Sequence, residues 1–81
     1  MPKEKIPIGI IHSAKDIGNA IRTKRKTDGL TQVDAAALCG VGARFLGELE
    51  RGKESAQVGK VIRIVQRLGL ELQIDLKGIK R

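Results

Sequence analysis

The chain has 81 residues, enough for one small domain with a modest core, and its 16 basic residues against 9 acidic ones give a formal net charge of +7. That charge favours a polyanionic partner, although a ribosomal or membrane-surface protein would also carry it. The lack of Tyr and Trp argues against single-stranded nucleic acid, whose binders stack bases on aromatic rings. A single Cys excludes an internal disulfide, and no apolar run is long enough for a membrane span or a signal peptide, so we expect a cytoplasmic protein without membrane contact.

Residues 1–12 precede the first helical pattern. Within them, Ile6–Ile11 has the β-branched side chains of a short edge strand, but Pro7 lacks the N–H that a ladder needs and Gly9 weakens a strand. An extended arm whose isoleucines pack on the core is the slightly favoured alternative. Both interpretations stay open.

A helix is predicted from Ser13 to about Lys26. Ser13 is a suitable N-cap, and Asp16 occupies the reciprocal position of a capping box. The side chains expected to face the core are Ile17, Ala20 and Ile21. Turn residues at 27–29 end the helix.

Basic side chains crowd the last turns of this helix: Arg22, Lys24, Arg25 and Lys26. Cations there interact favourably with the negative end of the helix dipole. Their density exceeds what capping requires, so we expect these four side chains to contact DNA phosphates as a second use.

Residues 31–51 have the pattern of two short helices joined by a tight turn. The defining positions are a capping pair, a small residue for close approach, a turn glycine and two leucines on one side of the second helix: Thr31, Asp34, Ala36, Gly40, Leu46 and Leu49. An ordinary αα-hairpin shares some of these features. Their fixed offsets together favour a helix-turn-helix that lays its second helix in the DNA major groove.

The second helix of the motif has one face left for reading bases, and we assign that role to Ala43, Arg44, Gly47 and Glu48. Arg44 is the candidate for bidentate pairing to a guanine edge, and Ala43 for contact with a thymine methyl. Gly47 either lets the helix approach the groove closely or is a helix-weakening residue with no role. Glu48 either accepts from a cytosine amine or pairs with Arg44 or Arg51 one turn away, and we prefer the pairing.

Phosphate contacts are expected at both ends of the motif. At its start, Thr31, Gln32 and the free N–H groups of the helix can hold a phosphate. At its far end, Arg51 and Lys53 are expected to meet the DNA backbone. The motif itself is nearly neutral, so affinity is expected to come mainly from flanking elements.

A further helix is predicted from Ala56 to Leu68, with Ser55 as its cap. Its expected buried stripe consists of Val58, Val61, Ile62, Val65 and Leu68. Three cations share a different face, namely Lys60, Arg63 and Arg67. For these we expect a solvated helix face rather than specific contacts.

Residues 70–76 alternate apolar and polar side chains without interruption, which predicts a half-buried β-strand. A strand needs a partner, and the intrachain candidate, Ile6–Ile11, is compromised by Pro7. We therefore expect the same strand of a second molecule to pair with it across a two-fold axis, through Leu70, Leu72, Ile74 and Leu76. The division of the chain is then an arm at 1–12, a DNA-binding domain at 13–69, a dimerising strand at 70–76 and a basic tail at 77–81.

Nothing in the sequence predicts an enzyme, a metal site or a cofactor. His12 is the only His and lies beside the expected cap Ser13, without a carboxylate pair, a metal-ligand cluster or a phosphate-binding glycine loop. Cys39 falls in the helical pattern and is expected to be a small buried apolar residue rather than a nucleophile.

The motif region resembles the Xre/Cro/C1-type helix-turn-helix regulators in Leu30-Thr31-Gln32, Ala36-Ala37, Gly40-Val41, Phe45-Leu46 and Glu48-Leu49-Glu50-Arg51-Gly52-Lys53. The continuation looks more narrowly like the HipB-like antitoxins, in Val58-Gly59-Lys60-Val61, Leu68-Gly69-Leu70 and the alternating segment after them. The resemblance covers roughly residues 13–76. It implies a mainly α fold, a four-to-five-helix Cro/C1-type (lambda-repressor-like) domain whose C-terminal β-strand joins its dimer mate.

The same resemblance implies a repressor that binds a palindromic operator in double-stranded DNA as a homodimer, in the cytoplasm at the nucleoid. HipB-like antitoxins pair with HipA-like serine/threonine kinase toxins and repress their own operon, so a HipA-like toxin is an expected partner. A stand-alone Xre-family repressor and a protein-interaction module with a vestigial helix-turn-helix are the alternatives. Many members of the family have polar residues where this chain has Gly42 and Ala43, so base reading falls more heavily on Arg44.

Overall fold

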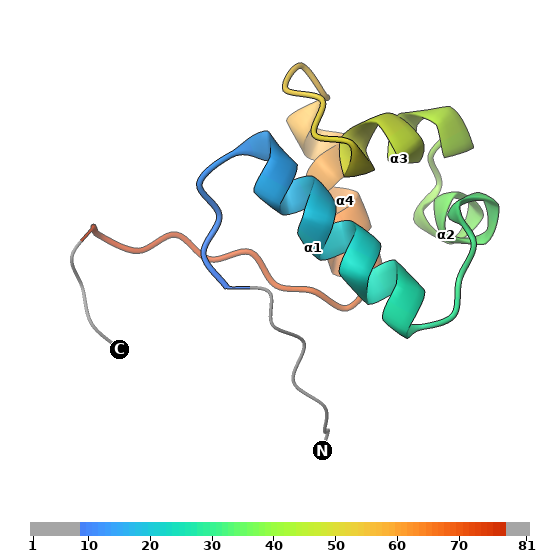
Figure 1. The fold of residues 1–81 in the computed structure, drawn as a ribbon, viewed down its shortest axis with the longest axis horizontal. Coiled ribbons are helices and arrows are strands. Elements are labelled where there is room, and N and C mark those ends of the chain that lie inside the picture. The colour runs from blue at the N-terminus through green and yellow to red at the C-terminus, as the bar shows by residue number, and fades with distance from the viewer. Residues whose placement is uncertain (1–8, 78–81) are drawn as a thin grey trace.

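The computed structural model describes residues 9–77. Their regular elements are the helices α1 (Ala14–Thr27), α2 (Gln32–Cys39), α3 (Ala43–Glu50) and α4 (Val58–Arg67), shown in Figure 1. The mainly α fold is confirmed, with four helices in the described part of the chain. No helix in residues 9–77 is long and apolar enough to cross a bilayer.

The N-terminus of α1 is capped as the sequence predicts. Ser13 is extended, and its hydroxyl accepts a hydrogen bond from the Asp16 N–H at 3.3 Å. The Asp16 carboxylate in turn accepts from the backbone N–H of His12 at 2.8 Å. The helix therefore starts where its local sequence satisfies the first free N–H groups.

α1 and α3 cross closely at a glycine that the sequence analysis did not single out. A Cβ built on Gly18 would overlap the carbonyl oxygen of Leu49 and lie 2.9 Å from that of Glu50. Only a residue without a side chain allows the two backbones to approach this far. Gly18 thus sets the distance between the first helix and the motif's second helix.

The helix-turn-helix geometry of residues 31–51 is confirmed. The Thr31 hydroxyl caps α2 by accepting from the Asp34 N–H at 3.0 Å. Gly40 ends α2 in the left-handed region at φ 72°, and its N–H donates back to the Ala36 and Ala37 carbonyls. The core between the helices consists of buried side chains from all four elements: Ile21, Ala35, Ala36, Cys39, Leu46, Leu49, Val61, Ile64, Val65 and Leu68.

α4 begins later than expected and buries a different stripe. Its N-cap is Gln57, so Ser55 is not the cap and the predicted start at Ala56 is wrong. Val58 is 69% exposed and Ile62 is 39% exposed, whereas Ile64 is fully buried. The expected and observed stripes share Val61, Val65 and Leu68, and only packing against the other helices decides between them.

The three cations of α4 have partners within the protein. Arg63 and Arg67 donate to the carbonyl oxygens of Gly40 and Leu38 at 3.3 and 3.1 Å. Lys60 Nζ lies 5.2 Å from the centre of the Phe45 ring. Arg63 and Arg67 are exposed, as a solvated face requires, but both also donate to carbonyls at the C-terminal end of α2, which the sequence did not predict.

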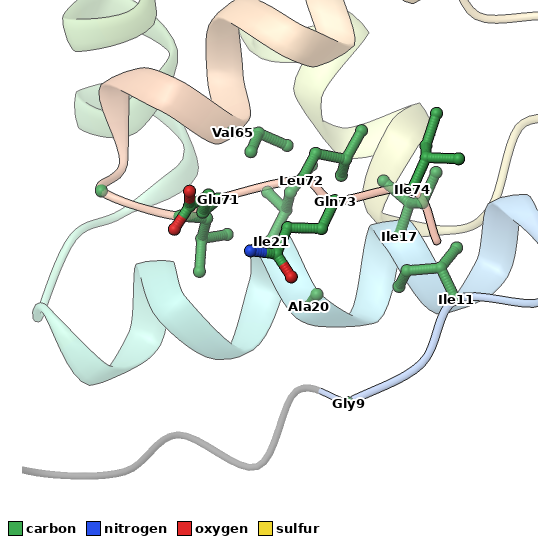
Figure 2. A pocket seen from close by; sticks show the side chains of 12 residues that line it. Gly9, Ile11, Ile17, Ala20, Ile21, Val65, Glu71, Leu72, Gln73 and Ile74 are labelled. Atoms are coloured by element: carbon green, nitrogen blue, oxygen red, sulfur yellow. The ribbon is translucent and has the colours of Figure 1, made fainter. Parts of the chain in front are cut away.

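Residues 70–76 form no strand in this single chain. The segment runs beside α1 and α4, and its residues 70–74 line a groove of about 550 Å³ together with Ile17 and Val65 (Figure 2). The expected strand is absent because the described part of the chain, residues 9–77, offers no second strand to pair with. Of the alternative partner Ile6–Ile11, residues 6–8 lie outside the described residues, and residues 9–11 are irregular.

The apolar side chains of this segment are mostly uncovered. Leu70 packs against the core, but Leu72 is 47%, Ile74 95% and Leu76 77% exposed. The alternation that predicts a strand is therefore accompanied by exposed apolar side chains at Leu72, Ile74 and Leu76.

Candidate DNA-binding interface

The outward face of α3 is formed by Arg44, Glu48 and Arg51, while Leu46, Leu49 and Glu50 point inward and are buried. The Arg44 side chain is 91% exposed. This division follows from the helical period, because residues at i, i+4 and i+7 share a side. The outward face carries two cations around one carboxylate.

Two of the four expected base-reading positions lie elsewhere than expected. Gly47 is buried rather than outward, because the Gln32 amide lies over it: a Cβ there would meet Gln32 Oε1 at 3.3 Å and an Arg51 guanidinium nitrogen at 3.6 Å. Ala43 is half-buried and packs against the core. In the free protein, the Gln32 amide therefore lies against Gly47.

Glu48 pairs within the protein. Its Oε2 accepts from Arg44 Nε at 3.2 Å, as in the pairing that the sequence favoured, and its Oε1 accepts from Lys53 Nζ at 3.0 Å. The bonds from Lys53 and from Arg44, in that order, lower the pKa of Glu48. Glu48 is therefore a fixed, ionised acceptor between two cations.

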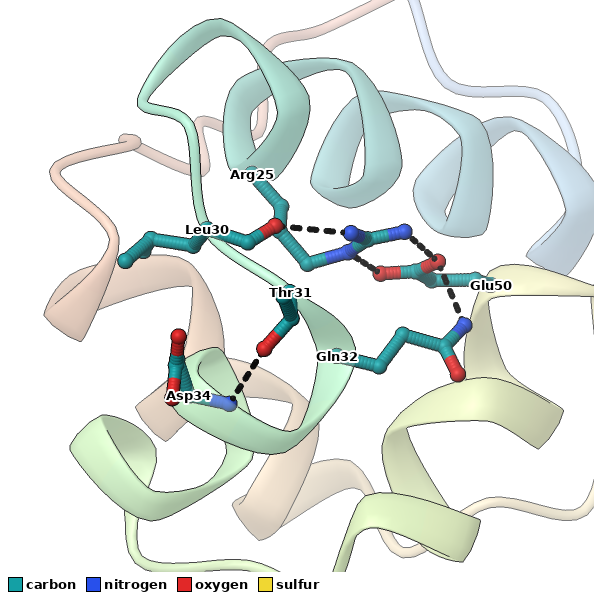
Figure 3. Close-up of polar contacts among 6 residues, drawn as sticks. All are labelled: Arg25, Leu30, Thr31, Gln32, Asp34 and Glu50. Atoms are coloured by element: carbon teal, nitrogen blue, oxygen red, sulfur yellow. Dashed lines mark hydrogen bonds and ion pairs between the residues drawn. The ribbon is translucent and has the colours of Figure 1, made fainter.

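A buried ion pair fixes α3 against α1 (Figure 3). Arg25 donates through Nε and a terminal nitrogen to the two oxygens of Glu50, at 2.6 and 2.9 Å, and it also donates to the Leu30 carbonyl at 2.9 Å. Counted over the whole residue, Arg25 is only 7% exposed and Glu50 only 6%. Arg25 is therefore removed from the expected phosphate contacts, because its guanidinium is sequestered in the interior.

The charge state of this pair follows from its hydrogen bonds. Burial by itself would raise the pKa of Glu50, but hydrogen bonds from Arg25 and Gln32 outweigh it, so the pKa is lowered. The bond to Glu50 also raises the pKa of Arg25. Both groups are ionised at neutral pH, and the pair is a charged, fully hydrogen-bonded unit.

The start of α2 is tied to the same unit. Gln32 Nε2 donates to Glu50 Oε1 at 3.0 Å, which orients the amide across α3. Thr31 stands beside it as the helix cap. The expected phosphate site at the start of α2 is thus rigidly connected to the end of α3.

The remaining cations of α1 differ in their freedom. Lys24 is paired with Asp28 at 2.6 Å, whereas Arg22 and Lys26 are exposed. Arg22 lies close enough to Glu50 to contribute to its lowered pKa. Of the four basic residues expected at phosphates, these two are the least engaged in the described structure.

No group of three or more His, Cys, Asp and Glu in residues 9–77 is placed to hold a metal ion. Cys39 is fully buried, as expected from the sequence, and burial raises the pKa of its thiol. It is therefore an unreactive core residue.

Comparisons with known proteins agree with this geometry. A family model described as Helix-turn-helix matches residues 21–74. The uncharacterized HTH-type transcriptional regulator y4mF of Sinorhizobium fredii is 42% identical over 71 residues, which cover 88% of this chain and 93% of that protein.

Solved structures share the fold. A HipB variant in an O2 20mer complex superposes with a TM-score of 0.77 at 22% identity, covering 85% of this chain and 96% of that one. The HipA-HipB-O2-O3 complex contains a chain with the same TM-score and identity, covering 85% of this chain and 97% of its own. The motif, the family match and the curated relative together show that the chain belongs to the Xre/Cro-C1-type helix-turn-helix family.

Proposed function

We propose that the protein is a sequence-specific repressor of transcription that binds double-stranded DNA with α3. The observation that carries this proposal is the outward face of α3, where Arg44 stands exposed, together with the capped start of α2, which Gln32 joins to Glu50 of α3. Both parts of this surface rest on the buried Arg25–Glu50 pair, so they are held in one fixed relation. Such a rigid arrangement is what docking a helix in the major groove requires.

Base reading falls mainly on Arg44. Its side chain is long and exposed, and a bidentate contact from it to guanine is worth about 1–3 kcal/mol of discrimination. Ala43 and Gly47 add at most apolar contact and close approach, because one is half-buried and the other is covered by Gln32.

Phosphate contacts surround this reading face. Thr31 and Gln32 stand at the start of α2, where the helix dipole favours an anion, and Arg51 stands at the end of α3. From α1, Arg22 and Lys26 are exposed, and Lys24 joins them on release from Asp28. These contacts orient the domain without reading sequence.

A homodimer is the proposed binding unit. The groove beside residues 70–74 is lined by apolar side chains, and Leu72, Ile74 and Leu76 are exposed in the single chain. The same segment of a second copy would cover this surface and complete a two-stranded ladder. Two copies of α3 would then stand about 34 Å apart and require a palindromic operator.

A role as antitoxin is the narrower part of the proposal. It is supported by the fold shared with HipB, which occurs in a solved complex with HipA. A stand-alone repressor is the second candidate, favoured by the curated relative, which is named an uncharacterized HTH-type transcriptional regulator. A kinase-like toxin gene beside this one, and co-purification of its product, would support the antitoxin; absence of both would favour the stand-alone repressor. We propose no enzymatic activity and place the protein in the cytoplasm at the nucleoid.

Footprinting on the DNA upstream of the protein's own gene tests the proposal. We expect protection of two half-sites one helical turn apart, and a dimer mass by light scattering that is lost when Leu72 and Ile74 are replaced by Asp. If the folded protein protects no duplex, repression is refuted and the remaining alternative is a protein-interaction module. An unchanged dimer mass in the double variant would refute pairing through residues 70–76.

A further inference from the structure

Three charged side chains, two on α3 and one in the loop after it, form a continuous chain of contacts. Lys53 Nζ lies 3.0 Å from Glu48 Oε1, and Glu48 Oε2 lies 3.2 Å from Arg44 Nε. One carboxylate therefore has both oxygens engaged, one by the loop after α3 and one by the outward face of the helix. The Glu48 side chain is only 25% exposed, whereas that of Arg44 is 91% exposed. A partly sheltered anion thus holds an arginine that reaches into solvent.

The atom that Glu48 engages decides which edge of Arg44 remains for a ligand. A guanidinium can donate in pairs through Nε and one terminal nitrogen, or through its two terminal nitrogens. Because Glu48 accepts from Nε, the pair formed by the two terminal nitrogens remains available. That pair matches the O6 and N7 acceptors of guanine in the major groove.

We propose that Glu48 and Lys53 are positioning residues for Arg44 and set the preference for guanine at the base pair that Arg44 reads. This inference rests on the proposed function. It gives Lys53 a role within the protein in addition to any phosphate contact, and it gives Glu48 a role on Arg44 instead of on a cytosine amine. Without the contact to Glu48, Arg44 would lose more side-chain freedom on binding. It could then present a different pair of N–H groups to a different acceptor.

The test is selection from duplexes with a random core of about 20 bp, the length of two half-sites. It compares the wild type with Glu48→Gln, Lys53→Met and Glu54→Gln. Glu54 is the matched control because it is exposed, follows the same helix and loses the same charge. A thermal melt of each variant establishes that it is folded.

We expect the wild type to select guanine at one position in each half-site. Glu48→Gln should lower that preference about five-fold, and Lys53→Met by a smaller factor that Lys53→Arg restores. Glu54→Gln should leave the preference unchanged, although both Glu→Gln variants bind all duplexes more tightly because a negative charge is gone. In an Arg44→Ala background, Glu48→Gln should have no further effect on the preference.

Results that differ from these expectations would overturn either the positioning role or the proposed function. Equal changes in guanine preference for Glu48→Gln and Glu54→Gln would overturn the inference, because charge alone would then explain both. Loss of a preference at a base pair other than the one that Arg44→Ala affects would overturn it too, since Glu48 would then be reading a base directly. An unchanged guanine preference in Glu48→Gln would overturn only the positioning role. Failure of the folded wild type to select any duplex would overturn the proposed function as well.

Discussion

Glu48 and Glu50 stand two residues apart on α3, and each pairs with an arginine, but in opposite environments. The Glu50 and Arg25 side chains are 3% and 8% exposed, and their contacts span 25 positions of the chain. Glu48 pairs with Arg44 one turn away, on the solvent side of the same helix. The same two functional groups therefore occur once as an interior connection and once as a surface contact.

Burial decides what each pair can do. Water screens an exposed pair, which therefore contributes little to stability. A buried pair cannot be opened without leaving a charge uncompensated in the interior, so it is costly to break. On this chain the inner pair, Arg25–Glu50, fixes where α3 lies. The outer pair, Arg44–Glu48, faces the proposed ligand.

The largest effect is expected from opening the inner pair with Glu50→Gln. This change leaves the Arg25 charge buried without a counter-ion and should lower the free energy of unfolding by about 3–5 kcal/mol. A domain of this size has a total stability of about 4–12 kcal/mol, so the variant should be close to unfolding at growth temperature. Chemical denaturation followed by circular dichroism measures the loss.

The matched control replaces both partners by apolar residues, as Arg25→Met with Glu50→Leu. Because neither charge is then left alone, much of the lost stability should return. A double variant as unstable as Glu50→Gln would show that removing the uncompensated charge does not restore stability, because the Leu30 carbonyl and the Gln32 amide have then lost their partners.

The second-largest loss of stability is expected at the close approach of α1 to α3, beside the Arg25–Glu50 pair. Gly18→Ala places a methyl group against the Leu49 and Glu50 carbonyls and should cost about 1–3 kcal/mol or more. Gly59→Ala in α4 is the control, since a Cβ built there meets nothing within 4 Å and the change should instead stabilise by up to about 1 kcal/mol. Equal gains in melting temperature for both would contradict the close approach.

Acid should remove the contribution of the inner pair. The pKa of Glu50 is lowered in the folded protein, so its stabilisation is present above the ordinary value of 4.5 and is lost as pH falls below 4.5 through the folded pKa. The difference in unfolding free energy between the wild type and Glu50→Gln should therefore narrow across that range. A difference that stays constant from neutral pH to well below 4.5 would mean that folding does not change the pKa of Glu50.

The sequence predicted the features that depend on neighbouring residues. The caps Ser13 and Thr31, the reversal at Gly40 and the inward Leu46 and Leu49 each follow from local hydrogen bonding or helical period. The local sequence is therefore enough to predict these parts of the motif.

The missed features depend on contacts between distant elements. Gly18 looks like any helix glycine until α3 is laid against it, and Arg25 looks like one more terminal cation. One signal for Glu50 was present: it stands one turn beyond Leu46 and next to Leu49, on the side of the helix that must be buried. A carboxylate there requires a buried cation, and the crowded end of α1 supplied the candidates.

The outer pair should give the smallest effect on stability and the clearest effect on recognition. Arg44→Ala removes an exposed side chain, so the melting temperature should stay within experimental error, while discrimination at one operator base pair falls by about 1–3 kcal/mol. Arg51→Ala is the control on the same face: as a phosphate contact it should weaken binding to all duplexes alike and reduce the salt dependence by about one charge. Competition binding against single-base operator variants separates the two. If Arg44→Ala also weakened binding to all duplexes alike, Arg44 would be another phosphate contact. The outer and inner pairs would then differ in burial, and the outer pair would have no part in reading the sequence.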